Sequence, residues 1–295
     1  MKKINHLMAI FAMFVAACSN EPQIVSDVDN SDALVPVRVH VDGFNVSQEE
    51  FPSTRATALA GYSDVNAVTL AFYNGSTEIC KATQLKSDKT TYTTFGNFSL
   101  SLPMGSYTMV VVAYYTNDNT VLTLTSPTEA SLNVHPRETF AKTQTVNISN
   151  TNAVDISATL SRIVSLLTVT STDGKTADVT NVRMTFSAGG KDFNPTTGLA
   201  ITNTGFANTV GNSAAAGSQS TSSSYLFLAS DEQTMNVTIE TLNADGAVLF
   251  SKTVNNVSFK RNRKTILTGP MYTNAGVAGT FQVNDTWISA NNVNF

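Results

Sequence analysis

The stretch Val-Pro-Val-Arg-Val-His-Val, residues 35–41, places a valine at every second position, with proline or a polar residue between. Successive side chains of a strand point to opposite faces of a sheet, so a period of two predicts a β-strand with one buried face. The same alternation recurs in residues 98–102, 154–160 and 235–239. We therefore expect a chain built from half-buried strands.

Two near-continuous apolar runs, residues 107–115 (YTMVVVAYY) and 163–169 (IVSLLTV), suit central strands covered on both faces. Turn pairs such as Asn74-Gly75 and Asp245-Gly246 separate the strand-like runs, and no convincing helical period follows the N-terminal segment. The expected fold is all-β, with two consecutive β-sandwich domains of transthyretin-like or Greek-key type.

The N-terminal segment has the layout of a signal peptide. Lys2 and Lys3 precede an apolar run over residues 7–17, which is shorter than the about 20 residues a membrane-spanning helix needs. Val15-Ala16-Ala17-Cys18 resembles the lipobox of bacterial lipoproteins, in which the cysteine carries a diacylglycerol and a further acyl chain such as palmitate. We expect lipidation at Cys18 and a precursor anchored in the outer membrane. The alternative is an ordinary signal peptide that happens to contain a cysteine.

Composition limits the partners. Charged residues make up 14%, the net charge is −4 and the pI is about 5.3, so nucleic acid is not an expected partner. The basic cluster KRNRK, residues 260–264, is expected at an exposed turn or edge. Lipidation of Cys18 would leave no second cysteine for an internal disulfide, and the strand-like stretch Thr77-Glu78-Ile79-Cys80 predicts that Cys80 is a small buried residue rather than a nucleophile.

The chain divides into four expected parts. Residues 1–17 are the signal peptide, 18–55 a lipidated pro-segment with the first strand, 56–160 an N-terminal sandwich and 161–295 a C-terminal sandwich. Residues 205–224, uncharged and without clear periodicity, are expected to form a long flexible loop on the second domain.

Catalysis and metal binding find little support. His40 lies on the polar face of an alternating strand and His135 precedes a proline, and neither belongs to a known catalytic or zinc-binding spacing. Neighbouring carboxylates such as Glu49-Glu50 are better explained as solvated loop charges. We expect no enzyme activity, no cofactor and no metal site.

Arg55 stands in the polar segment Pro-Ser-Thr-Arg-Ala-Thr and is the only Lys or Arg between Arg38 and Lys81. A trypsin-like protease would find one accessible bond here, between Arg55 and Ala56. The alternative is an ordinary loop arginine.

Several features in order resemble the fimbrillins of Bacteroidales type V pili and their lipoprotein relatives. They are the lipobox at 15–18, the valine strand, Thr-Arg-Ala at 54–56, the strand VNAVTLAFYNG, the run LSRIVSLLTV at 160–169 and RNRKT at 261–265. The likeness covers most of the chain as a layout of short motifs, of which the lipobox is the most specific.

The resemblance implies a mechanism. An arginine-specific protease would cut after Arg55 and remove the pro-segment, including the strand that carries Val35, Val37, Val39 and Val41. A strand from the next subunit would fill the groove left behind. In that family the donor lies near the C-terminus, and the matching residues here are Phe281, Val283, Val293 and Phe295. The implied partners are other fimbrial subunits, the protease and the outer membrane.

The function expected is therefore a structural or accessory subunit of a surface fimbria. One alternative is a non-polymerising surface lipoprotein, either a fimbrial anchor that keeps its lipid and first strand or a glycan-binding protein of a nutrient-uptake system. Trp287 is the only tryptophan, so an aromatic sugar-binding platform is not evident.

Overall fold

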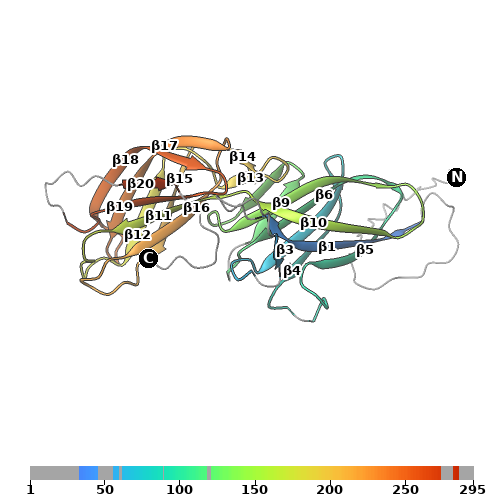
Figure 1. Ribbon diagram of the computed structural model, residues 1–295, viewed down its shortest axis with the longest axis horizontal. Coiled ribbons are helices and arrows are strands. Elements are labelled where there is room, and N and C mark those ends of the chain that lie inside the picture. Colours follow the sequence, from blue (N-terminus) through green and yellow to red (C-terminus); the bar gives the residue numbers. More distant parts are fainter. Residues whose placement is uncertain are drawn as a thin grey trace, which may run out of the picture.

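The computed structural model describes residues 33–45, 56–59, 62–88, 90–117, 121–273 and 282–285. Its strands, β1 to β20, form two lobes side by side along the long axis of the molecule (Figure 1). No α-helix occurs within the described ranges, so the all-β prediction is confirmed. It follows that none of these residues belongs to a helix long and apolar enough to cross a membrane.

The first lobe is one eight-stranded sheet that bends into two layers. The strand order is β2-β1-β10-β9-β6-β3-β4, with β5 also paired to β1. The pairing of β10 with β9 joins Ser161 to Ala141 and Arg162 to Phe140, and at this short contact one layer turns into the other. The strands are β1 (Val35–Asn45), β2 (Ala56–Ala58), β3 (Ala67–Asn74), β4 (Thr77–Leu85), β5 (Asn97–Leu102), β6 (Gly105–Tyr114), β9 (Thr139–Ile148) and β10 (Val154–Arg162).

The second lobe is a sandwich of two four-stranded sheets, β16-β11-β19-β20 and β15-β12-β17-β18. Its core lies between them and includes Leu167 and Val169 from one sheet and Val182 and Met184 from the other. The strands are β11 (Ser165–Ser171), β12 (Asn181–Phe186), β15 (Phe206–Gly211), β16 (Thr221–Leu226), β17 (Glu232–Leu242), β18 (Val248–Lys260), β19 (Lys264–Gly269) and β20 (Gln282–Asp285).

A fourth sheet takes strands from both halves of the chain. Strands β7 (Leu122–Ser126) and β8 (Glu129–Leu132) come from the first half, and β13 (Asp192–Asn194) and β14 (Leu199–Ala200) from the second. The order β14-β13-β8-β7 is closed by the pairing of Phe193 with Ala130. This bridging sheet was not expected from the sequence, and it joins the two lobes through backbone hydrogen bonds.

The bridging sheet explains the apolar run of residues 107–115. Val111 and Met109 of β6 face the core of the first lobe, whereas Val110 and Val112 face a separate cluster that includes Leu124 of β7. Strand β6 is therefore covered on both faces, as predicted. Cys80 is also buried in the first-lobe core, as expected. The expected boundary between residues 160 and 161 lies inside β10 and stays a prediction.

The expectation of a long loop over residues 205–224 is wrong. Strand β15 occupies Phe206–Gly211 and pairs with β12, and β16 begins at Thr221. The strand alternates, but its one fully buried position is Asn208, whose amide donates to the Ser224 hydroxyl at 2.9 Å. A buried polar residue that is satisfied by a cross-sheet hydrogen bond hides the apolar period from a sequence reading.

The basic cluster does form a turn, between β18 and β19, as expected. Its charges are not simply solvated, however. Lys260 pairs with Glu232 at 2.7 Å and Arg261 with Asp231 at 2.6 Å, and both acidic residues lie at the start of β17 or just before it. The cluster thus closes one end of the second lobe at the junction with the first.

Candidate functional site: the strand at the centre of the first lobe

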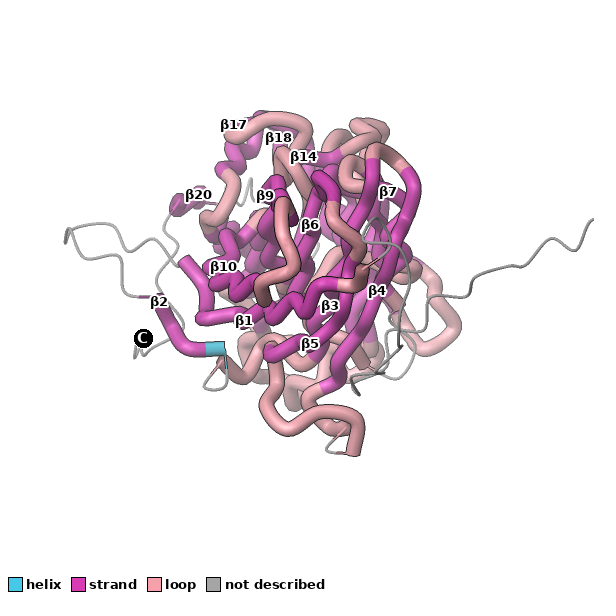
Figure 2. Tube along the Cα trace, turned by 90° about the vertical axis from the view of Figure 1, so that its right-hand side faces the viewer, coloured by secondary structure: helices cyan, strands magenta, loops and turns pink. Residues whose placement is uncertain are grey.

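Strand β1, which carries the four predicted valines, lies between two partners in its layer. It runs parallel to β10 from Val37 opposite Val154 to Asn45 opposite Ser161, and antiparallel to β5 from Val35 opposite Leu102 to His40 opposite Asn97. Figure 2 shows β1 beside β5, and β10 close by, at this end of the molecule. An N-terminal strand in this position is an integral part of the layer rather than an added edge.

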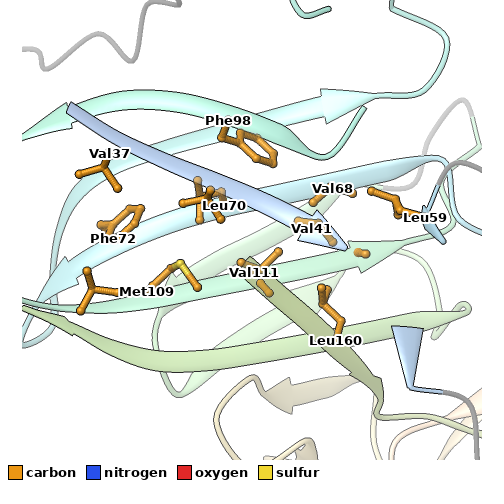
Figure 3. Packing of buried hydrophobic residues seen from close by; sticks show 14 of the residues in the cluster. Val37, Val41, Leu59, Val68, Leu70, Phe72, Phe98, Met109, Val111 and Leu160 are labelled. Atoms are coloured by element: carbon orange, nitrogen blue, oxygen red, sulfur yellow. The ribbon is translucent and has the colours of Figure 1, made fainter. Parts of the chain in front are cut away.

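The inward face of β1 is completely buried. Val35, Val37, Val39 and Val41 have exposed fractions of 0, 0, 1 and 2%. Figure 3 shows Val37 and Val41 on β1, which crosses the strands carrying Leu70, Phe72, Met109 and Val111. These residues belong to one hydrophobic cluster. Burial of a valine contributes about 1.5–3 kcal/mol, so the four together contribute roughly 6–12 kcal/mol.

Phe44 adds a fifth inward side chain that the alternation did not predict. A register shift between Val41 and Gly43 inserts one residue into β1, so the side chain that turns inward next belongs to Phe44. The only signal in the sequence is a glycine within a strand and next to a large aromatic residue, a combination that indicates a bulge. Phe44 is 0% exposed and faces Leu160 across the β1–β10 pairing.

The Phe44 ring packs in an aromatic cluster at the end of the groove. Its centroid lies 4.1 Å from that of Phe140 and 5.1 Å from that of Tyr62, and the last two rings are 5.5 Å apart. Phe140 is the β9 residue at the bend between the layers, paired with Arg162. The cluster therefore lies where the first lobe meets the second.

A buried ion pair covers the other side of this cluster. The Arg162 guanidinium lies 4.9 Å from the Phe140 centroid, and its Nε donates to Glu138 Oε1 at 2.5 Å. Its Nη2 donates to the Tyr62 hydroxyl at 2.6 Å and its Nη1 to Asn262 Oδ1 at 2.9 Å. The side chains of Arg162 and Glu138 are 1% and 3% exposed. The sequence analysis did not find these residues, because they are up to 100 positions apart in the chain.

Tyrosine hydroxyls complete the surroundings of Glu138. Burial, followed by the negative charge of Glu138, raises the pKa of Tyr62, which donates to Glu138 Oε1 at 3.1 Å. Burial and then Glu138 likewise raise the pKa of Tyr225 from the second lobe. Both hydroxyls therefore remain protonated donors toward the carboxylate at any physiological pH.

The outward face of β1 is polar and exposed. Arg38 pairs with Asp155 of β10 at 3.3 Å, and the His40 Nε2 lies 3.2 Å from Asp42 Oδ1. His40 Nδ1 also bonds to Asn97 of β5. These contacts link β1 to both neighbours at the surface, but exposed pairs of this kind contribute little to stability.

Of the predicted processing residues, only Ala56 is among the described residues. Cys18 and Arg55 are outside the described residues. Ala56 opens β2, whose three residues pair with the end of β1 from Asn45 opposite Ala56 to Gly43 opposite Ala58. The bond after Arg55 therefore directly precedes a strand that is paired to β1.

Part of the predicted donor region pairs within the chain. β20 pairs antiparallel with β19, with Val283 opposite Leu267, and forms one edge of its sheet. Phe281, Val293 and Phe295 lie outside the described residues. Just after β19, the Asp173 carboxylate accepts hydrogen bonds from the backbone amides of Met271, Tyr272 and Thr273 at 2.8–2.9 Å. The chain is thus held firmly where it leaves β19.

Two open clefts flank the junction. One of about 590 Å³ is lined by residues of β9 and the β18–β19 turn, and one of about 530 Å³ lies along β9 and β6 toward the β7–β8 turn. Thr143 and Thr196 line both. No aromatic ring is among the described residues that line either cleft.

Within the described ranges, no group of three or more His, Cys, Asp and Glu side chains is arranged to hold a metal ion. His135 is half-buried, and burial, with the positive charges of Arg137 and Lys191, lowers its pKa to about 4. The imidazole of His135 is therefore neutral at physiological pH.

The fold is similar to that of several solved surface proteins. The fimbrial anchor protein Mfa2 from Porphyromonas gingivalis superimposes with a TM-score of 0.51 at 10% identity, covering 86% of this chain and 98% of Mfa2. A candidate adhesin from Bacteroides ovatus gives 0.51 at 13% identity, covering 86% and 94% of the two chains. A second candidate adhesin from the same species gives 0.50 at 12% identity, covering 79% and 88%. At these identities the similarity is one of fold.

Among curated protein sequences, none matches this chain. One family model does, over residues 38–292, from within β1 to beyond β20. The protein belongs to the DUF6562 family, a family of unknown function.

Proposed function

We propose that the protein is a subunit of a bacterial cell-surface fimbria, exported as a lipid-anchored precursor and assembled by replacement of β1. The observation that carries the proposal is the place of β1, an N-terminal strand hydrogen-bonded on both sides and buried along one face. The fimbrial and adhesive names of proteins with a similar fold agree with it. The proposed role is structural and involves no catalysis by this chain.

Loss of β1 would leave a groove in the middle of a layer. The facing edges of β5 and β10 would both lose their backbone partners, and the side chains around Leu70 and Met109 would lose the cover of β1. Unpaired strand edges beside an apolar floor readily accept an added strand. A strand that replaces β1 in the same direction would run parallel to β10 and antiparallel to β5.

Cleavage after Arg55 would separate β1 from the rest of the chain. The ten residues 46–55 connect the end of β1 to β2. A cut before Ala56 leaves β2 with the body of the subunit and β1 with the lipidated fragment. The proposed cut therefore breaks the covalent link to the lipid anchor at Cys18 and makes β1 exchangeable for a competing strand.

The C-terminal region is the proposed donor. β20 is short and paired on one side, with β19, so it is held by fewer hydrogen bonds than a central strand. Its region carries Phe281 and Val283, and the chain ends in Val293 and Phe295. One donor and one groove per subunit make a head-to-tail contact, which builds a filament.

A non-polymerising anchor subunit is the second candidate. The similarity in fold to the fimbrial anchor Mfa2 favours it. Such a subunit would keep its lipid on Cys18 and would keep β1 in place. The difference between the two roles lies in whether the bond after Arg55 is cut.

The N-terminal residue of the protein recovered from the cell surface tests the proposal. We expect Ala56, together with oligomers that resist mild heating in detergent and dissociate on boiling. A lipid-bearing Cys18 on all the material without oligomers would reject polymerisation and leave the anchor role. Binding of the intact protein to a glycan array would instead favour nutrient capture.

Arg55→Lys tests the role of the cut, because it keeps the positive charge but blocks an arginine-specific protease. We expect the variant to reach the surface, to retain Cys18 and to form no oligomers. Oligomers of normal length from this variant would remove Arg55 from the mechanism.

A further inference from the structure

A continuous set of contacts runs from β1 to the second lobe. It begins at Phe44, the last inward residue of β1, and passes through Phe140 and Tyr62 to the buried Arg162–Glu138 pair. It ends at Asn262, in the turn between β18 and β19. Val37 lies away from this connection, because it pairs with Val154 at the opposite end of β10.

The first half of this connection is apolar. The centroid of the Phe44 ring lies 4.1 Å from that of Phe140, whereas the Tyr62 centroid lies 5.5 Å from it. Phe140 in turn lies 4.9 Å from the Arg162 guanidinium. The three groups are buried to 0–3% exposure, so Phe44 supports the ring on which the guanidinium rests and excludes water from that side.

The second half is polar and spans the lobes. Beside the Arg162 side-chain bond to Asn262, the backbone amide of Asn262 donates to Val164 O at 2.9 Å and that of Ile163 donates to Thr139 O at 3.1 Å. Gly198, at a φ of +72°, packs so closely here that a Cβ would come within 2.7 Å of both Arg261 and Ile163. The junction is therefore closely packed at Gly198, whereas Arg162, Ile163 and Asn262 also line the cleft of about 590 Å³ beside it.

We propose that Phe44 couples the state of the β1 groove to the junction between the two lobes. With the ring in place, the Arg162–Glu138 pair is dry and holds Asn262. Without it, water reaches Phe140 and the ion pair, the local dielectric rises and the hold on Asn262 weakens. The junction would thus be tight when the groove is filled and loose when it is empty.

This coupling is a property of the intact chain and does not require polymerisation. If the proposed function holds, the coupling adds a requirement for the replacing strand. That strand must place a large apolar side chain at the buried position that Phe44 occupies. A strand that filled only the valine positions would leave the lobes loosely joined.

The test compares Phe44→Ala with Val37→Ala in the uncleaved protein. Both residues are 0% exposed and lie on the same strand, but only Phe44 contacts the junction. Amide hydrogen exchange is followed at Asn262 and Ile163, with urea added to match the global stability of the samples. We expect exchange at these two amides to rise roughly tenfold in Phe44→Ala relative to the matched Val37→Ala, a typical size for coupling between groups in contact.

Phe44→Leu serves if the alanine variant does not fold, because it keeps most of the apolar volume. A smaller increase confined to the same two amides would support the coupling. Equal exchange at the junction in the Phe44 and Val37 variants at matched stability would overturn it. Since the chain is never cut, this outcome would leave the proposed strand replacement untouched.

Discussion

At the scale of single residues, the junction contains the most buried ion pair formed by the described residues, Arg162 with Glu138. Three donors surround the Glu138 carboxylate: the Tyr62 hydroxyl, the Arg162 guanidinium and the Tyr225 hydroxyl. Removal of one partner from such a pair leaves an uncompensated charge in a low-dielectric site, and this cost exceeds the net value of the pair itself.

Glu138→Gln should therefore destabilise the protein by about 3–5 kcal/mol, because the Arg162 charge loses its counter-ion inside the protein. Urea unfolding measures the change. Arg38→Ala removes a partner from the exposed Arg38–Asp155 pair and should cause little or no loss. Similar losses for the two variants would mean that the junction is wetter than its burial indicates.

His135 should make the protein less stable in mild acid. Burial and the charges of Arg137 and Lys191 lower its pKa from 6.5 to about 4, so the folded protein holds it neutral. The unfolded chain takes up the proton below its ordinary pKa of 6.5, so stability falls as the pH decreases from 6.5 to about 4. His135→Gln should flatten this part of the curve of melting temperature against pH. An unchanged slope would assign the acid sensitivity to other groups.

At the scale of elements, β1 is held in three ways. It pairs with β10, β5 and β2, its inward face is buried, and its outward face is linked to both long neighbours by polar contacts. Breaking the chain beside such a strand does not remove these interactions. Release of β1 therefore requires a competing strand or unfolding, as well as a cut.

The cut protein should consequently keep its N-terminal fragment. After cleavage following Arg55, we expect the fragment that carries β1 to co-elute with residues 56–295 in gel filtration and to separate in denaturant. Mass spectrometry under native and denaturing conditions measures this. Val39→Ala serves as the comparison, because it removes buried apolar contact from β1 and should speed release of the N-terminal fragment. Immediate dissociation of the wild-type fragment would show that pairing alone does not hold β1.

At the scale of the whole molecule, the lobes share a sheet and a core. Phe193 of β13 stacks on Phe227 with centroids 4.5 Å apart, in a cluster that also includes Val112 of β6 and Leu132 of β8. This cluster is built from both halves of the chain. Unfolding of either lobe would expose it, so the lobes should unfold together.

We therefore expect one urea transition for both lobes, seen as coincident loss of amide protection in β6 and β17. Phe193→Ala should destabilise both by about 3–5 kcal/mol, the usual range for a buried phenylalanine. Ile201→Ala, at a 48% exposed side chain nearby in the chain, is the control and should have little effect. Two separate transitions in the wild-type protein would show that the bridging sheet does not couple the lobes.

The local pattern of the chain was sufficient for many of the strands and for the inward face of β1. Val35, Val37, Val39 and Val41 face the core because a strand alternates its side chains, whatever it packs against. A near-continuous apolar run identified β6 as a central strand, and a strand-like stretch placed Cys80 in the interior. Periodicity failed at Phe44, where a bulge changes the phase, and at Asn208, where a hydrogen bond replaces apolar contact.

Only the tertiary structure decided which strands meet. The place of β1 between β5 and β10, the bridging sheet, and the Tyr62–Glu138–Arg162–Asn262 network all join residues far apart in the chain. Such pairings depend on the summed packing and desolvation of the whole fold and leave no local period. The sequence by itself determined that the first strand has a face to bury, and the tertiary structure decided that this face completes the core of one lobe and reaches the junction with the other.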